Sequence, residues 1–128
     1  MRSIFFAICL VSSTLSMAQV EVRTYHDPDQ RELLRELYYV SYPGSNIIVG
    51  TYKQFHPNQK LAMEGEYVDG YRDGEFKEFY ASGQLQRSMI YRMGTKEGPV
   101  KVFDDSGNLI QSAIFHADKL SDSLYLYY

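Results

Sequence analysis

The chain has 128 residues, a formal net charge of −3 and one cysteine. This length is enough for one domain, and the weak negative charge argues against a nucleic-acid-binding groove and against an acidic interaction tail. Tyrosine and phenylalanine are abundant, with 12 and 7 residues, and tryptophan is missing. This composition suits strands that pack rings on a pleated surface better than it suits helices.

Residues 1–18 have the layout of a secretory signal peptide. An apolar run from Ile4 to Leu15 follows a basic residue, and a small-x-small cleavage site ends at Ala18, just before Gln19. The run is shorter than the ~20 apolar residues that a membrane-spanning helix needs. We therefore expect cleavage between Ala18 and Gln19 and export to the periplasm or the exterior. Cleavage also removes Cys9, so the mature chain is expected to rely on packing and strand pairing instead of disulfides.

Residues 19–49 are expected to form an N-terminal strand and a degenerate first repeat. The first seven of them alternate between apolar and polar side chains with the period of a half-buried strand. Residues 31–40 (RELLRELYYV) are ambiguous, because their leucines recur at helical spacing behind Pro28, which could start a helix. Register favours a second strand instead: Tyr38 lies 29 residues before Tyr67, which fits a 24-residue repeat with a turn enlarged by five residues.

Residues 50–128 repeat with a period of 24 residues. Three full copies begin at Gly50, Gly74 and Gly98, and Asp122 starts a partial fourth copy that stops at Tyr128. Four columns of mostly apolar residues recur at this spacing: Tyr52, Phe76, Val100 and Leu124; Phe55, Phe79, Phe103 and Tyr127; Leu61, Leu85 and Leu109; and Tyr67, Tyr91 and Phe115. Such a period indicates stacked units, each of which buries its rings mainly against its neighbours.

Each copy is expected to be a β-hairpin that leads into the next one. Its first turn falls at His56–Gln59, Tyr80–Gly83 and Asp104–Gly107, and its second turn falls around Asp69–Gly70, Met93–Gly94 and Ala117–Asp118. Gly83 and Gly107 fit the positive φ of a tight hairpin, and Gln59 departs from this pattern. Phe76 and Phe79 are three residues apart, so either a β-bulge brings them to one face or rings cover part of both faces. The predicted fold is all-β, an elongated single-layer antiparallel β-meander built from hairpin repeats of about 24 residues.

With its columns aligned, the repeat resembles the MORN-type repeat in its bacterial variant. The resemblance is carried by Gly50, Gly74 and Gly98; by HPNQKL at 56–61, ASGQL at 81–85 and SGNL at 106–109; and by the Tyr-x-x-Gly stretches at 67–70 and 91–94. It covers about residues 25–128 and implies an elongated single-layer sheet without catalytic residues. Many bacterial proteins of this kind are labelled antitoxins of the YwqK type, and related eukaryotic repeats are described as membrane-associated or as scaffolds.

Residues that could carry other chemistry favour structural interpretations. His26, His56 and His116 lie far apart at different repeat positions, which does not suit a metal site. The aspartate-rich turns are too short for calcium loops, and carboxylate pairs such as Glu64 with Glu66 lie on strands without an evident pocket. We therefore expect no catalytic residue, no metal and no cofactor.

One candidate binding feature is a stripe of lysines and rings. Each of Lys53, Lys77 and Lys101 lies two residues before one of Phe55, Phe79 and Phe103. Lysine and ring would therefore share a strand face in each copy and form a row that could meet an acidic partner, a glycan or lipid headgroups. The alternative is a solvated face on which the lysines balance nearby acids.

A second candidate feature is the C-terminal edge of the sheet. Its residues are Leu124, Tyr125, Leu126, Tyr127 and Tyr128, which would form a strand with free backbone groups and few charges. Such an edge predicts pairing with a second copy of the chain or with a partner strand. The alternative is an edge capped by a bulge or by the chain's own N-terminus.

Together these features predict an exported, non-catalytic repeat module that mediates protein–protein or cell-envelope interaction, without nucleic acid. An antitoxin-like or immunity-like binder is the alternative, and it requires that residues 1–18 are retained. A more remote alternative is an enzyme that acts on envelope glycans, which requires an acidic pair in a real cleft.

Overall fold

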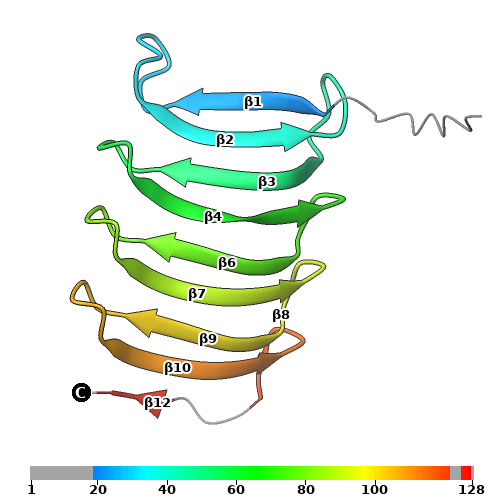
Figure 1. Cartoon of the computed structure of the whole chain (residues 1–128). Helices are drawn as coiled ribbons and strands as arrows, with labels where there is room; N and C mark the ends of the chain where they lie inside the picture. The colour runs from blue at the N-terminus through cyan, green and yellow to red at the C-terminus, as the bar shows by residue number, and fades with distance from the viewer. Residues whose placement is uncertain (1–18, 122–124, 128) are drawn as a thin grey trace, which may run out of the picture.

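The computed structural model describes residues 19–121 and 125–127, and in that part of the chain it contains strands and turns but no helix. The strands are β1 (Val20–Tyr25), β2 (Leu34–Val40), β3 (Ile48–Phe55), β4 (Leu61–Val68), β5 (Tyr71–Arg72), β6 (Gly74–Phe79), β7 (Leu85–Arg92), β8 (Thr95–Lys96), β9 (Gly98–Phe103), β10 (Leu109–His116), β11 (Lys119–Leu120) and β12 (Tyr125–Leu126). They form one antiparallel sheet in which strands follow one another in space as they do in sequence (Figure 1). The prediction of an all-β antiparallel meander is confirmed.

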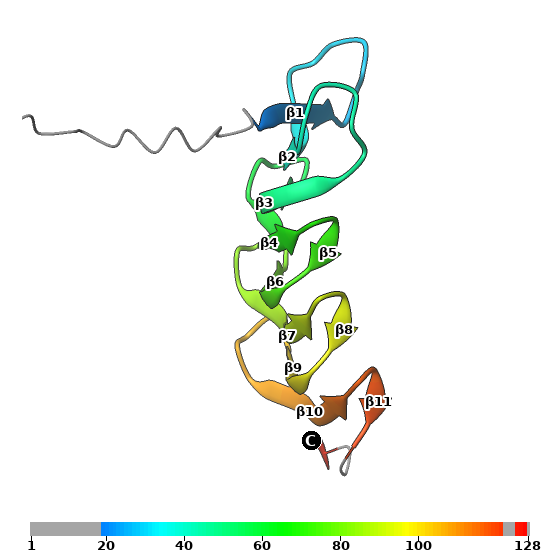
Figure 2. The same ribbon diagram turned by 90° about the vertical axis from the view of Figure 1, so that its right-hand side faces the viewer.

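The repeating unit is a long hairpin followed by a short one. In each of the three later copies the second long strand turns back through a two-residue turn into a short strand, so that β5, β8 and β11 pair with β4, β7 and β10. Asp69 and Gly70 at the first of these turns have φ of 49° and 84°, the positive pair that a type I′ hairpin turn needs. Seen edge-on, the long strands form a single layer from which the short strands stand off on one side (Figure 2).

Residues 31–40, which could have been helical, contain strand β2, as the repeat register predicts. Leu34 pairs with Tyr25 in the first copy, and Leu61 pairs with Phe55 in the second, so Leu34 and Leu61 are equivalent. The strand β2 therefore lies 27 residues before its counterpart β4, and not the 29 residues that the sequence suggested. Tyr38 therefore occupies the place of Gly65, not that of Tyr67. The first copy is a complete one in which each of the two turns is three residues longer than in the later copies.

A β-bulge recurs at the same place in every long hairpin. In the second copy Gln54 pairs with Met63 while the next residue, Phe55, pairs with Leu61, so the extra residue is Ala62 on β4. The first strand of the hairpin keeps its regular alternation, and Phe55 stays on the face opposite to Tyr52. Of the two arrangements that the sequence left open, rings on both faces is the one that the structure shows.

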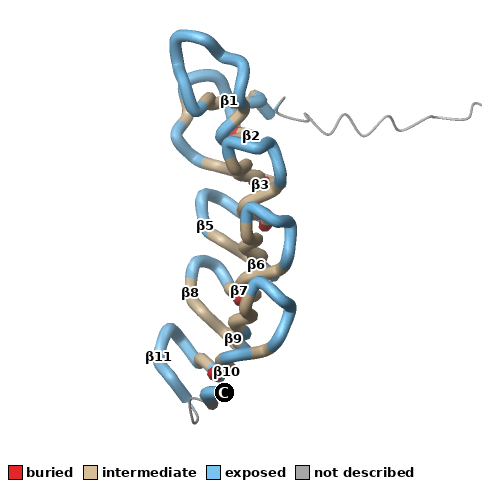
Figure 3. The backbone as a smooth tube through the Cα atoms, turned by 90° about the vertical axis from the view of Figure 1, so that its left-hand side faces the viewer, coloured by how far each residue is buried: buried red, intermediate tan, exposed pale blue. Residues whose placement is uncertain are grey.

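The buried side chains line one face of the sheet. Those that the described residues bury are Val40, Tyr52, Phe76, Met89 and Ala113. On the same face five rings, called here the aromatic ladder, contact one another in sequence: Tyr38, Tyr52, Tyr67, Phe76 and Tyr91, with centroids 5.4–5.9 Å apart. Figure 3 shows the consequence, with buried and half-buried backbone along the strands and exposed turns on both sides. Each copy is therefore stabilised mainly by its neighbours.

Candidate binding surfaces

The two faces of the sheet differ in chemistry. The face with the aromatic ladder, called the ladder face, is partly covered by the short strands. The opposite face, called the lysine face, carries Lys53, Lys77 and Lys101, which alternate with the ladder-face residues of their strands. Since the extra residue of each bulge lies on the other strand, Phe55, Phe79 and Phe103 share the lysine face with these lysines.

Acidic and neutral residues separate the three lysines. Glu64 lies in register between Lys53 and Lys77, and Ser88 lies between Lys77 and Lys101. Lys77 Nζ is also 3.9 Å from Glu75 Oε2. The first two lysines thus face carboxylates, as on an ordinary solvated surface, whereas Lys101 lies between two serines. Positive charge on this face is therefore least balanced at its C-terminal end.

A second row on the lysine face changes character along the sheet. It runs in register from Glu66 and Glu75 to Ile90, Pro99 and Ile114. Glu66 and Glu75 accept hydrogen bonds from Thr51 and Ser88. In contrast, the side chains of Ile90 and Ile114 are 37% and 42% exposed. Ile90, Pro99 and Ile114, called here the isoleucine patch, form an exposed apolar surface beside Lys101.

The ladder face contains a half-buried network of polar groups near its N-terminal end. The Tyr52 hydroxyl donates to Glu36 at 2.7 Å, and Thr24 donates to the other oxygen of the same carboxylate. Burial, together with the bond to Glu36, raises the pKa of the Tyr52 phenol above its ordinary value. Both oxygens of the Glu36 carboxylate are thus satisfied, so these residues hold neighbouring strands together and do not offer free chemistry.

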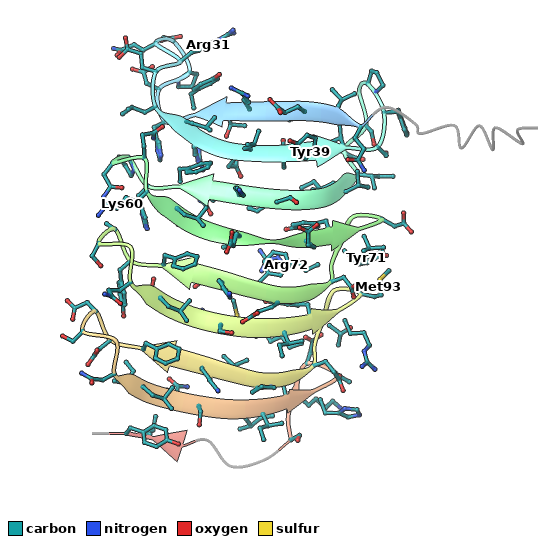
Figure 4. All side chains as sticks on the ribbon, in the orientation of Figure 1. Arg31, Tyr39, Lys60, Tyr71, Arg72 and Met93 are labelled. Atoms are coloured by element: carbon teal, nitrogen blue, oxygen red, sulfur yellow. The ribbon has the colours of Figure 1, made fainter. Side chains whose placement is uncertain are left out.

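Arg72, on the short strand β5, completes the aromatic ladder (Figure 4). Its guanidinium lies 4.9 Å from the ring centroid of Phe76 and donates hydrogen bonds to the hydroxyls of Tyr67 and Tyr91. The side chain therefore joins two consecutive copies. Sequence reasoning missed it because the equivalent position holds Ile48, Lys96 and Leu120 in the other copies, so no shared chemistry marks the column.

The histidines require a correction. His26 and His56 occupy equivalent positions, not different ones, because the longer turns of the first copy hide the correspondence. Each ring lies within hydrogen-bond distance of the backbone carbonyl of the next copy, at Phe55 and Phe79, and the Tyr80 hydroxyl donates to Phe103 in the same way. Within residues 19–121 and 125–127, no cluster of three metal-binding side chains occurs. The two histidines connect neighbouring copies.

Gln59 stands where the later copies have Gly83 and Gly107, and its side-chain contacts account for the difference. It has a φ of 66°, the left-handed conformation that Gly83 and Gly107 supply in later copies. Its side-chain amide accepts a hydrogen bond from the Leu34 N–H and donates one to the Leu34 carbonyl, both at 3.0 Å. Gln59 thereby pairs with a strand end that the longer first turn leaves open, and this contact compensates for the strained backbone.

Several hollows occur on the described surface, including the following two. One, of about 640 Å³, lies beside the first turn and is lined by Arg23, Arg31 and Arg35 among others, although Arg23 is already paired with Glu21. The other, of about 330 Å³, lies on the ladder face near the C-terminal end. Its walls include Met89, Val100 and Phe115. It is called here the ladder hollow.

The two edges of the sheet lie at opposite ends of the stack (Figure 1). In the described part of the chain, β1 pairs only with β2 and β12 pairs only with β10. Leu126 pairs with Gln111 as Val102 pairs with Arg87 one copy earlier, and the Tyr127 N–H donates to the Ile110 carbonyl. Leu124 and Tyr128 of the predicted edge, like the predicted signal peptide, lie outside the described residues.

The family model for the MORN repeat variant matches residues 48–69, 72–92 and 96–117, half of the chain. Each match spans one long hairpin. The chain belongs to the MORN repeat variant family. The resemblance drawn from the glycine and aromatic columns is thereby confirmed, and a MORN repeat is a non-catalytic module that commonly serves in binding. No protein with a curated description matches the chain. Among the described residues of this MORN-repeat protein, no helix is long and apolar enough to cross a bilayer.

Proposed function

We propose that this MORN-repeat protein is an exported, non-catalytic module that binds a protein or another component of the cell envelope. The observation that carries the proposal is the isoleucine patch. Large apolar side chains are exposed there, where a row of glutamates on the lysine face gives way to isoleucine and proline, and contiguous exposed apolar surface marks an interaction site. The neighbouring Lys101 gives the site a positive rim, which suits a partner with an acidic border. Export is inferred from the signal-peptide layout of residues 1–18.

Substitutions within the repeat test the patch without introducing a residue that the fold does not already hold. Ile90 and Ile114 occupy the position that Glu66 holds in the second copy. The double variant Ile90→Glu with Ile114→Glu is therefore expected to fold and to lose retention on envelope fractions. Glu66→Gln is the matched control and should bind like the wild type. Equal retention of the double variant and the wild type would refute the patch.

The lysine row has its own test. Replacement of Lys53, Lys77 and Lys101 by Gln is expected to weaken envelope retention, mostly through Lys101, which lies between serines. The single variant Lys101→Gln should therefore reproduce most of the effect. Unchanged retention in the triple variant would remove the lysines from the proposal.

Export itself is tested by N-terminal sequencing of the protein recovered from cells. A mature chain that begins at Gln19 supports the envelope function. A chain that retains Met1 would overturn export and favour an antitoxin-like or immunity-like binder instead.

We also propose that the C-terminal edge pairs two copies of the chain. Strand β12 offers the backbone groups on its outer side to another strand, because only β10 pairs with it among the described residues. Light scattering of the intact protein should then give a dimer, and truncation before Leu124 should give a monomer. A strictly monomeric intact protein would refute the pairing.

A further inference from the structure

The aromatic ladder stops before the sheet does. Ring-to-ring contacts connect Tyr38 to Tyr91, and in the remaining described residues none continues toward the C-terminus. Continuation would need a ring at position 100, which is equivalent to Tyr52 and Phe76. Val100 stands there instead. Met89, at the position of Gly65, fills part of the space that the ring would take, and the space left open lies beside Val100 and Ala113.

The ladder hollow is this open space beside Val100 and Ala113. It has a volume of about 330 Å³ and opens on the ladder face. Its apolar walls are formed by Met89, Val100, Phe115 and Leu120. A space of this size, lined mainly by apolar groups with a few polar ones, is typical of a site that holds one or two side chains or a small ligand.

Two cations border the same hollow. The Arg87 guanidinium is one of them, and its Nε is buried without a hydrogen-bond partner in the described structure, 3.7 Å from Glu78. Lys96 is the other, with its ammonium 5.1 Å from the ring centroid of Phe115. None of the ion pairs in the described part of the chain involves Lys96.

Comparison with the preceding copy shows what Lys96 lacks. Arg72, at the equivalent position, donates to two tyrosine hydroxyls. In the last full copy Phe115 replaces the second of these tyrosines, so one acceptor is missing, and no side-chain hydrogen bond from Lys96 occurs among the described residues. Next to Lys96, the last full copy thus lacks one ring and one acceptor at the same place.

We propose that the ladder hollow binds a partner peptide in which an aromatic side chain stands next to a carboxylate. The ring would lie beside Val100 and Ala113, which are smaller than Phe76 and Met89 at the equivalent positions, and the carboxylate would accept hydrogen bonds from Lys96 and Arg87. Charge complementarity selects an acidic partner, and the missing ring selects an aromatic one. The proposal rests on the proposed function only in that the occupant is a protein, and it places contact on the face opposite to the isoleucine patch.

The test uses the isotope-labelled protein and the peptide acetyl-Gly-Glu-Phe-Gly-amide, followed by NMR shifts of the backbone amides. Binding with a Kd on the order of 1 mM is expected for so small a ligand. Shifts should concentrate at Val100, Ala113 and Phe115. Control peptides with Gln for Glu, or with Ala for Phe, should bind at least about tenfold more weakly, a change of about 1.4 kcal/mol.

Variants taken from the neighbouring copy fill the hollow. Val100→Phe restores the missing ring, and Ala113→Met introduces the residue found at the equivalent Met89. Each should abolish peptide binding, and Ala113→Met provides an independent test if the ring at position 100 cannot be accommodated beside Met89. Lys96→Gln should weaken binding several-fold. Lys101→Gln, which removes a lysine of strand β9 from the opposite face, should leave peptide binding unchanged.

Three results would overturn the proposal. The first is peptide binding that survives both filling variants, and the second is a set of NMR shifts confined to the lysine face. The third is a protein that binds phosphatidylglycerol vesicles but not the peptide, if the Val100→Phe substitution abolishes the vesicle binding. Absence of peptide binding in a protein that still captures its envelope partner would refute this inference alone. Loss of export or of the isoleucine-patch phenotype would refute the proposed function and leave the ladder hollow standing.

Discussion

The ring of Phe76 lies directly over the backbone of Gly65 on the neighbouring strand. A Cβ atom at position 65 would be 2.5 Å from the nearest ring carbon, and Phe76 is itself completely buried. The next copy reverses the sizes, with Met89 at the glycine position and Val100 at the phenylalanine position. A large side chain on one strand is therefore matched by a small one on the neighbouring strand where two copies meet.

Gly65→Ala should destabilise the protein by about 1–3 kcal/mol, because the added methyl group forces the buried ring out of place. Gly65 is not among the residues with positive φ, so the backbone accepts alanine and the loss is steric. Urea unfolding measures it. In the background of Phe76→Leu the same change should cost much less, and additive effects of the two substitutions would contradict direct contact.

Arg72→Gln should lower stability by about 1–3 kcal/mol, since it removes the charge over the Phe76 ring and the hydrogen bonds to two tyrosine hydroxyls. The stability of Arg72→Lys should lie between that of the wild type and that of Arg72→Gln, because lysine keeps the charge but not the planar guanidinium group. Arg92→Gln, an exposed arginine of the same hairpin region, is the control. If both glutamine variants shift the thermal midpoint equally, Arg72 has no special role.

The repeat period was sufficient to predict the turns and the long strands of the copies that begin at Gly50, Gly74 and Gly98, but not the short strands β5, β8 and β11. Asp69–Gly70 and its equivalents recur at 24-residue spacing, and the residues that make a hairpin turn are local features. The faces of the rings could not be predicted in this way. Whether Phe79 joins Phe76 depends on which strand carries the extra residue of the bulge, and that is decided by pairing between strands.

The candidate sites were only partly predictable for a related reason. His26 and His56 appeared unrelated because three additional residues in each turn of the first copy displace the repeat. The ladder hollow follows from one valine in an aromatic column, which the sequence displays, but its cations come from a different strand pair. The lysine row was visible in sequence, and the glutamate that lies between two of its members became apparent only from the register.

Acid should destabilise the C-terminal turns through Glu97. Hydrogen bonds from the Ala117 N–H and from the His116 ring hold the pKa of the Glu97 carboxyl below its ordinary value. The unfolded chain therefore binds the proton more readily, so this contribution is present above the ordinary glutamate pKa of about 4.3 and is lost as the pH falls below it.

Urea midpoints measured between about pH 6 and pH 3 test this prediction. The wild type should lose stability across the range, and Glu97→Gln should lose less, because the amide does not titrate. Asp104→Asn should behave likewise, since hydrogen bonds from the turn residues Asn108 and Ser106 lower the pKa of that carboxyl too. Parallel curves for the wild type and Glu97→Gln would contradict the assignment.

Met93→Asn should stabilise the protein. Met93 has a φ of 46° at the first central position of a type I′ turn, where asparagine is preferred and most side chains are strained by about 1–2 kcal/mol. Its side chain is 45% exposed, so little packing is lost, and its backbone N–H can still donate to Asp73. A gain of about 0.5–1 kcal/mol should raise the thermal midpoint by roughly 2–6 °C.

Asp69→Asn at the equivalent turn is the control and should change the thermal midpoint little, because aspartate already tolerates this conformation. A lower midpoint for Met93→Asn would show that the exposed methionine contributes more to the folded state than its backbone strain removes.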